Sequence, residues 1–298
     1  MNILSRVVPA LLVCLLAAAP VRADGITDSD GNRIDIGSGF GRIISLYVAH
    51  TQNLVSMGAE EKIIAVSGSD TTLQRPRLRY RDDAERFLAL GPDLVLIRPM
   101  ISRAHPQLVK RLRHAGVTVV SLQPVSIGGM FDYWKTLGQL CGRQEAAADM
   151  VRRFRSAVAA MEKKVEEIPV AARKRVYFES IHRRMKTFAP GSMAIFVLTA
   201  AGGINIAADA LQLRNTNIAE YGKERILARA EEIDVFLAQK GRMNPVSRRE
   251  IISEPGFQVI RAVRNGRVYL IDEKLVSRPT MGLLTGIRRL FGILYPER

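Results

Sequence analysis

Residues 145–168 read EAAADMVRRFRSAVAAMEKKVEEI, a run that contains neither glycine nor proline. Apolar side chains recur in it at spacings of three and four, at Met150, Phe154, Val158, Met161 and Val165. This spacing gathers them on one face of an α-helix and leaves the charged residues on the other face. At about 1.5 Å per residue the helix spans roughly 35 Å, the width of a small lobe. We expect it to end at Pro169, because proline interrupts the helical hydrogen bonds.

Short β-branched runs alternate with helical patterns on both sides of this helix, which is typical of βαβ units and parallel sheets. We expect strands at 42–46, 63–66, 93–97 and 117–121 before it, and at 175–179, 234–238 and 267–271 after it. The predicted fold is therefore α/β, with two doubly wound Rossmann-like lobes, one rigid bridging helix, and a ligand cleft between the lobes. The predicted boundaries are 24–143 for the N-terminal lobe, 144–169 for the helix and 170–298 for the C-terminal lobe.

The first 23 residues have the pattern of a cleaved signal peptide. A basic residue, Arg6, precedes an apolar run at 7–20, and small residues flank a cleavage site after Ala23. We therefore expect export to the periplasm. Lipid anchoring at Cys14 is the alternative, but Val13 stands where that motif requires a small residue.

The chain is strongly basic, with 44 Lys and Arg against 29 Asp and Glu. Loss of residues 1–23 would remove Arg6 and Arg22 and no acid, which lowers the formal net charge from +15 to +13. Such an excess suits an anionic ligand or a membrane surface, whereas export argues against nucleic acid as a partner. Cys141 would then be the only cysteine, so no internal disulfide can form. Paired carboxylates, metal-binding spacing and a catalytic Ser/His/Asp pattern are not evident, so we expect no enzyme.

Several short motifs follow one another in a recognisable order. They are RIISL at 42–46, ERFLALGPDLVL at 85–96, AGGINI at 201–206, PGF at 255–257, AVRNGRVY at 262–269 and LYPE at 294–297. In this order they resemble the binding proteins of ABC importers for iron–siderophores, haem and cobalamin. The resemblance implies a monomeric exported protein, without a cofactor of its own, that captures a metal chelate and delivers it to a permease–ATPase complex in the membrane.

The resemblance also implies two docking residues. In that family, one glutamate on the outer rim of each lobe engages arginines of the permease. Glu85, in the ERFLALGPD motif, and Glu224, in KERILAR, match these positions. Exposed carboxylates on a rigid body can form paired hydrogen bonds with guanidinium groups. Without the resemblance, both residues are ordinary solvated helix residues.

Candidate ligand-binding residues follow the predicted strands, because ligands of α/β sheets bind outside the carboxyl ends of the strands. They are Tyr47, His50, Asp70 and Arg98 in the first lobe, and His182, Arg183, Arg242 and Arg278 in the second. The arginines suit carboxylate or phosphate groups of an anionic chelate. A tyrosine or histidine could instead coordinate the metal axially. Cobalamin binders cradle the corrin with tryptophans, whereas the only tryptophan here, Trp134, falls in a helical pattern.

Two other functions share this fold. The chain could be an exported metal chelatase that uses His50, His182 and Glu179 as acid–base groups from both lobes. It could also be a sensor that reports ligand to a membrane receptor. The export signal and the two rim glutamates favour the binding protein over the enzyme.

Overall fold

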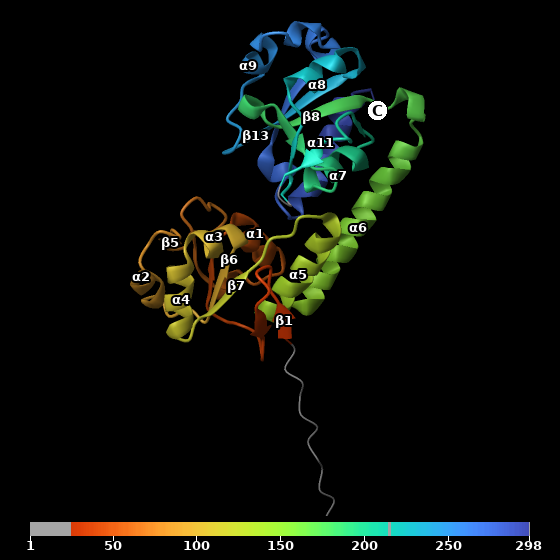
Figure 1. The fold of residues 1–298 in the computed structure, drawn as a ribbon. Coiled ribbons are helices and arrows are strands. Elements are labelled where there is room, and N and C mark those ends of the chain that lie inside the picture. The colour runs from red at the N-terminus through yellow and green to blue at the C-terminus, as the bar shows by residue number, and fades with distance from the viewer. Residues whose placement is uncertain (1–24, 214–215, 298) are drawn as a thin grey trace, which may run out of the picture.

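The computed structural model of the protein describes residues 25–213 and 216–297 (Figure 1). The predicted signal peptide, its cleavage site after Ala23 and the alternative lipidation site Cys14 lie outside the described residues. Within the described ranges, no helix combines the length and the apolar character needed to cross a bilayer.

The N-terminal lobe is built on a parallel sheet of five strands in the order β5-β4-β3-β6-β7. The strands are β3 (Ile43–Ser45), β4 (Ile63–Ser67), β5 (Arg77–Leu78), β6 (Leu94–Ile97) and β7 (Thr118–Ser121). The helices are α1 (Val48–Ser56), α2 (Ala84–Leu88), α3 (Pro99–Ala104) and α4 (Pro106–His114), with a 3-10 turn at Glu60–Lys62. A hairpin of β1 (Gly25–Thr27) and β2 (Arg33–Asp35) precedes the sheet. The sequence predicted four of the five strands and missed the two-residue β5.

The C-terminal lobe has a mixed sheet in the order β11-β12-β9-β8-β13-β14, with β10 also paired to β8. The strands are β8 (Arg175–Ile181), β9 (Lys186–Phe188), β10 (Ile204–Asn205), β11 (Leu211–Gln212), β12 (Ile218–Glu220), β13 (Val235–Lys240) and β14 (Val268–Asp272). The helices are α7 (Met193–Ala200), α8 (Lys223–Ala228), α9 (Arg248–Ser253), α10 (Arg261–Arg264) and α11 (Gly282–Leu294). Short 3-10 turns occupy Val170–Ala172, His182–Arg184, Ala230–Glu232, Phe257–Val259 and Glu273–Leu275. The sequence predicted β8, β13 and β14, which are parallel, but not the antiparallel β9, β11 and β12.

The lobes are joined by α5 (Ile127–Cys141) and the long helix α6 (Gln144–Glu166), which lie side by side. Figure 1 shows α6 running from the flank of the first lobe to the far end of the second. Gly138 of α5 lies so close to α6 that a β-carbon on it would come within 2.6 Å of the Ala147 methyl carbon. The missing side chain therefore allows the two helices to pack closely against each other.

One apolar core runs through both lobes and along the helices α5 and α6. On α6 the predicted stripe is buried at Met150, Phe154, Val158 and Val165. The Phe154 ring contacts Trp134 of α5 at 5.5 Å and Phe196 of α7 at 6.2 Å between ring centroids. Burial of one such aromatic side chain stabilises a fold by roughly 2–3 kcal/mol. The bridging helix is therefore part of the core of both lobes, and the predicted α/β two-lobe architecture is confirmed.

Candidate functional site

Two side chains meet where neighbouring strands of the N-terminal sheet end. Tyr47 follows β3 and Arg98 follows β6, and these strands are paired in parallel. Both side chains therefore emerge at the same edge of the sheet, as the strand-end rule requires. The Arg98 guanidinium carbon lies 4.3 Å from the centroid of the Tyr47 ring, which is a cation–π contact. The first lobe thus presents a positive charge fixed on an aromatic face.

The second lobe brings an ion pair to the same place. Arg278 Nη2 lies 3.5 Å from Glu273 Oε1, and both side chains are about three-quarters buried. Burial raises the pKa of Tyr47, whereas the positive charges of Arg98 and Arg278 oppose this rise and Glu273 adds to it. The Tyr47 hydroxyl therefore lies within the electrostatic reach of both lobes. We call Tyr47, Arg98, Glu273 and Arg278 the interlobe cluster.

Arg98 is incompletely paired within the cluster. Its Nη2 donates to the Met100 sulfur at 3.2 Å, but its Nε is buried and has no hydrogen-bond partner among the described residues. A buried donor without a partner typically costs about 1–3 kcal/mol. An anionic group on this guanidinium would remove that cost, so Arg98 has the property expected of a ligand-binding residue.

A tight turn places Arg242 next to the cluster. The backbone N–H of Arg242 donates to Glu273 Oε2 at 3.1 Å, while the Arg242 side chain is exposed. A β-carbon on the neighbouring Gly241 would lie 2.0 Å from the same carboxylate oxygen. Any larger residue at position 241 would require the Glu273 side chain to move. The exposed Met243 extends the same turn.

His182 belongs to a separate cluster within the C-terminal lobe. Its Nδ1 is 3.0 Å from Glu179 Oε2, and its Nε2 is 3.8 Å from Glu254 Oε2. Lys223 completes the chain with a 2.6 Å ion pair to Glu254. Burial lowers the pKa of His182, but the hydrogen bond and charge of Glu179 outweigh burial and the net pKa is raised. Arg183 is the exposed neighbour in the same 3-10 turn.

Two of the predicted ligand-binding residues, His50 and Asp70, have side chains that face the core. His50 is fully buried, its Nε2 donates to the Ile97 carbonyl at 3.1 Å, and its Nδ1 lies 2.7 Å from the Tyr133 hydroxyl. Burial lowers its pKa to about 3, so the ring is neutral. Asp70 is also fully buried, and its Oδ1 accepts from the Thr72 backbone N–H at 2.8 Å. Neither residue is accessible to a ligand in this structure.

The same geometry does not bring together the three residues of the alternative chelatase site, His50, His182 and Glu179. His50 is enclosed in the N-terminal lobe, whereas His182 and Glu179 pair with each other in the C-terminal lobe. Acid–base groups must reach the substrate by hydrogen bond or through one water molecule. A fully enclosed His50 cannot do so. Among the described residues, no set of three His, Cys, Asp or Glu side chains is arranged to hold a metal ion.

A buried polar contact that the sequence did not predict ties the lobes together beside the interlobe cluster. The carbonyl of Pro279 accepts from Asn53 Nδ2 at 2.9 Å and from Trp134 Nε1 at 3.0 Å. Asn53 also donates to the Tyr133 hydroxyl at 3.3 Å, which links this contact to His50. Trp134 is fully buried, so this tryptophan cannot cradle a ligand. We call Asn53, Trp134 and the Pro279 carbonyl the interlobe anchor.

The two rim glutamates are exposed on helices of different lobes. Glu85 lies on α2 with 75% of its side chain exposed, and its carboxylate is 4.0 Å from Arg111. Glu224 lies in the first turn of α8 and is exposed as well. Their exposure is what docking requires, and also what an ordinary surface glutamate shows.

Of the interlobe cluster, sequence reasoning missed only Glu273. This residue directly follows β14, so the strand-end rule would have found it if the strand had been extended by one residue to Asp272. The anchor residues had no such signal, because Asn53 and Trp134 sit inside helices and Pro279 contributes only a backbone carbonyl.

Comparison with known proteins agrees with this geometry. The family described as "Periplasmic binding protein" matches residues 43–275. A Bacillus subtilis protein, described as the uncharacterized ABC transporter substrate-binding lipoprotein YvrC, is 23% identical over 91% of this chain and 85% of its own length. A cobalamin-binding protein of Halobacterium salinarum is 25% identical over 88% of this chain and 72% of its own length.

A solved structure is similar in fold. It is a possible iron-binding, periplasmic solute-binding protein from Staphylococcus epidermidis, with a TM-score of 0.73 and 24% identity over 86% of this chain and 99% of that one. The two-lobe fold is therefore shared with this solute-binding protein. The chain belongs to the periplasmic binding protein family.

Proposed function

We propose that the protein is the solute-binding component of an ABC importer and captures an anionic metal chelate at the interlobe cluster. The observation that carries the ligand class is Arg98, whose buried Nε has no partner among the described residues and whose guanidinium is held on the Tyr47 ring. Arg278 adds a second guanidinium from the opposite lobe. Two guanidinium groups that approach from opposite sides suit carboxylate or phosphate groups on the rim of a ligand.

This chemistry favours some chelates over others. Haem carries two carboxylates and ferric citrate carries several, whereas the rim of cobalamin is made largely of neutral amides. The Halobacterium relative is named for cobalamin, but the buried Trp134 leaves no tryptophan to cradle a corrin in this chain. Exposed Met100 and Met243, on different lobes, offer apolar contact for a macrocycle.

The proposal is tested by titrating the purified protein with haemin, ferric citrate, ferrichrome and cyanocobalamin, followed by visible absorbance and calorimetry. We expect saturable binding of one of the two carboxylate-bearing chelates, and weaker or no binding of neutral ferrichrome and cyanocobalamin. The matched control is Arg289→Ala, which removes an exposed arginine of α11 that does not belong to the interlobe cluster. Binding of cyanocobalamin alone would overturn the anionic class while leaving a solute-binding protein.

We further propose that Glu85 and Glu224 dock the protein on its permease. The double variant Glu85→Ala with Glu224→Ala should keep its chelate affinity, because both residues are exposed and outside the interlobe cluster. It should no longer stimulate ATP hydrolysis by the permease–ATPase complex reconstituted in vesicles. Glu166→Ala with Glu297→Ala is a charge-matched control, and undiminished stimulation by the docking variant would refute the assignment.

A further inference from the structure

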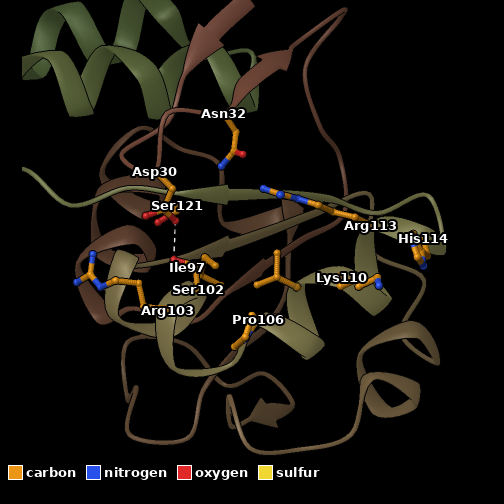
Figure 2. Close-up of a pocket in the computed structure, with 11 residues that line it drawn as sticks. Asp30, Asn32, Ile97, Ser102, Arg103, Pro106, Lys110, Arg113, His114 and Ser121 are labelled. Carbon is orange, nitrogen blue, oxygen red and sulfur yellow. Dashed lines mark hydrogen bonds between the residues drawn. The ribbon is translucent and has the colours of Figure 1, made fainter.

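A hollow opens on the N-terminal lobe beside the ends of β6 and β7. It has a volume of about 590 Å³, and every residue that lines it belongs to the first lobe. Its walls come from the hairpin turn between β1 and β2, the ends of β6 and β7, and the helices α3 and α4 (Figure 2). No residue of the interlobe cluster lines this flank hollow, although the lining residue Ile97 directly precedes Arg98 in the chain.

The charge of the flank hollow is predominantly positive. Lys110 and Arg113 line it from α4 and Arg103 lines it from α3, whereas Asp30 is the acid on the opposite wall. The Asp30 carboxylate already accepts a 2.5 Å hydrogen bond from the Ser102 hydroxyl. Arg113 Nη2 donates to the Val119 carbonyl at 3.2 Å, which fixes the guanidinium on the wall and leaves its other N–H groups for a ligand. Figure 2 shows the Arg113 side chain extending toward the part of the hollow where Ser121 lies.

An unpaired hydroxyl lies in the wall of the same hollow. Ser121 is 1% exposed, and its Oγ has no hydrogen-bond partner among the described residues. Buried hydroxyl groups in folded proteins are nearly always paired, so an exception calls for an explanation. A ligand oxygen that enters the hollow would supply the missing partner. Beside Ser121, Ile97 and Val109 give the hollow an apolar floor.

We propose that the flank hollow binds a small phosphate monoester. The phosphate dianion would lie between Lys110 and Arg113, whose two positive charges neutralise it, and would accept the hydrogen bond of Ser121. The carbon part of the ester would pack on Ile97 and Val109. The site shares no residue with the interlobe cluster, so this proposal does not rest on the import function.

The test is calorimetric titration with glycerol 3-phosphate, carried out in an Arg98→Ala/Arg278→Ala background so that the interlobe cluster cannot bind the anion. We expect saturable binding that Arg113→Ala weakens at least about tenfold and Lys110→Ala weakens severalfold, as loss of a charge-assisted hydrogen bond does. Arg289→Ala, which removes the same charge elsewhere, should leave the affinity unchanged. Titrations without saturation at millimolar ester, or an affinity indifferent to Arg113→Ala, would reject the site.

The variant Ser121→Ala tests whether the Ser121 hydroxyl binds the ligand or has a structural role. We expect weaker binding of glycerol 3-phosphate and a melting temperature equal to or above that of the parent, because the change removes an unpaired buried polar atom. A lower melting temperature with unchanged affinity would make the hydroxyl structural and remove it from the proposal.

A vesicle flotation experiment identifies the source of the phosphate group. Vesicles of phosphatidylcholine with phosphatidic acid present the same monoester on a surface. Arg113-dependent flotation that glycerol 3-phosphate suppresses would mean that a lipid headgroup occupies the hollow. Binding of the free ester without flotation assigns the site to a soluble metabolite.

Discussion

Two polar regions lie side by side at the junction of the lobes, and they differ in how their buried donors are paired. In the interlobe anchor, the donors Asn53 Nδ2 and Trp134 Nε1 both bond to the Pro279 carbonyl, whereas the acceptor Asn53 Oδ1 has no partner among the described residues. Neighbouring His50 is enclosed with both ring nitrogens in contact with a partner. In the interlobe cluster, Arg278 has a long contact to Glu273, and Arg98 keeps an unpaired buried Nε.

Adjacent residues of one segment, Arg278 and Pro279, belong to the two different regions. Because folding tends to pair every buried donor, the region whose donors are paired is expected to hold the structure, and the region with an unpaired cationic donor is expected to hold an anionic ligand. Residue type does not make this distinction, since both regions contain residues common in binding sites. The following changes test the contrast.

The largest effect is expected from Arg98→Ala with Arg278→Ala. Loss of two charge-assisted hydrogen bonds should weaken binding of haemin or ferric citrate roughly thousandfold, or about 4 kcal/mol. The free energy of unfolding should fall by less than this, because removal of the unpaired Arg98 donor partly offsets the loss of the contact with Tyr47 and of the Arg278–Glu273 pair. Calorimetric titration and urea denaturation measure the two quantities. An unchanged affinity would mean that the unpaired region is not the ligand site.

The second-largest effect is on the pH dependence of stability and comes from His50, which lies beside the interlobe anchor. His50 has a folded pKa of about 3 against an ordinary value of 6.5, so the unfolded chain binds a proton that the folded chain excludes. This contribution to stability is full above pH 6.5 and decreases as pH falls, by roughly 3 kcal/mol at pH 4. His50→Gln should therefore show a shallower loss of stability between pH 7 and pH 4 in urea denaturation. The exposed His114→Gln is the control, and parallel pH profiles for His50→Gln and the wild type would contradict the assignment.

The third effect is expected from Asn53→Ala, which removes the donor to Pro279 and to Tyr133. Loss of these two buried hydrogen bonds should lower the free energy of unfolding by about 2 kcal/mol, although the Pro279 carbonyl keeps Trp134 and the Tyr133 hydroxyl keeps His50 as partners. Chelate affinity should stay within a few-fold of the wild type. Stability is measured in urea and affinity by calorimetry. A variant with unchanged stability and reduced chelate affinity would show that the interlobe anchor contributes to ligand binding instead of stability.

The smallest effect is expected from His182→Gln. Because the pKa of His182 is raised in the folded chain, mainly by Glu179, its contribution to stability is full below pH 6.5 and is lost as pH rises through the folded pKa. This is the opposite direction from His50. The difference in unfolding free energy between wild type and variant should therefore shrink from pH 6 to pH 9. A difference that grows over this range would show that Glu179 does not hold the proton on His182.

The sequence predicts the large features of the fold because they leave periodic signals. The stripe from Met150 to Val165 locates the bridging helix, and β-branched runs locate the buried parallel strands. The antiparallel strands β9, β11 and β12 have only two or three residues each, too few for an alternation to be recognised.

The strand-end rule finds positions along the chain but not the direction of each side chain. It correctly placed Tyr47 and Arg98 together, since both follow paired strands. His50 is only three residues beyond Tyr47, yet it lies in the first turn of α1, which directs it to the core against Tyr133. Asp70 likewise turns inward to the backbone of Thr72. These orientations depend on tertiary packing with α5 and on local turn geometry, which one sequence does not encode in a visible pattern.

The interlobe anchor has a spectroscopic consequence. Trp134 is the only tryptophan of the chain, and its indole N–H donates to the Pro279 carbonyl of the other lobe. The tryptophan fluorescence of the protein therefore comes from a single indole ring in the interlobe anchor. A shift in the emission wavelength when chelate saturates the protein would report that the lobes move relative to each other at the anchor. Constant emission would mean that the anchor keeps its hydrogen bond and that the lobes do not move when the ligand binds.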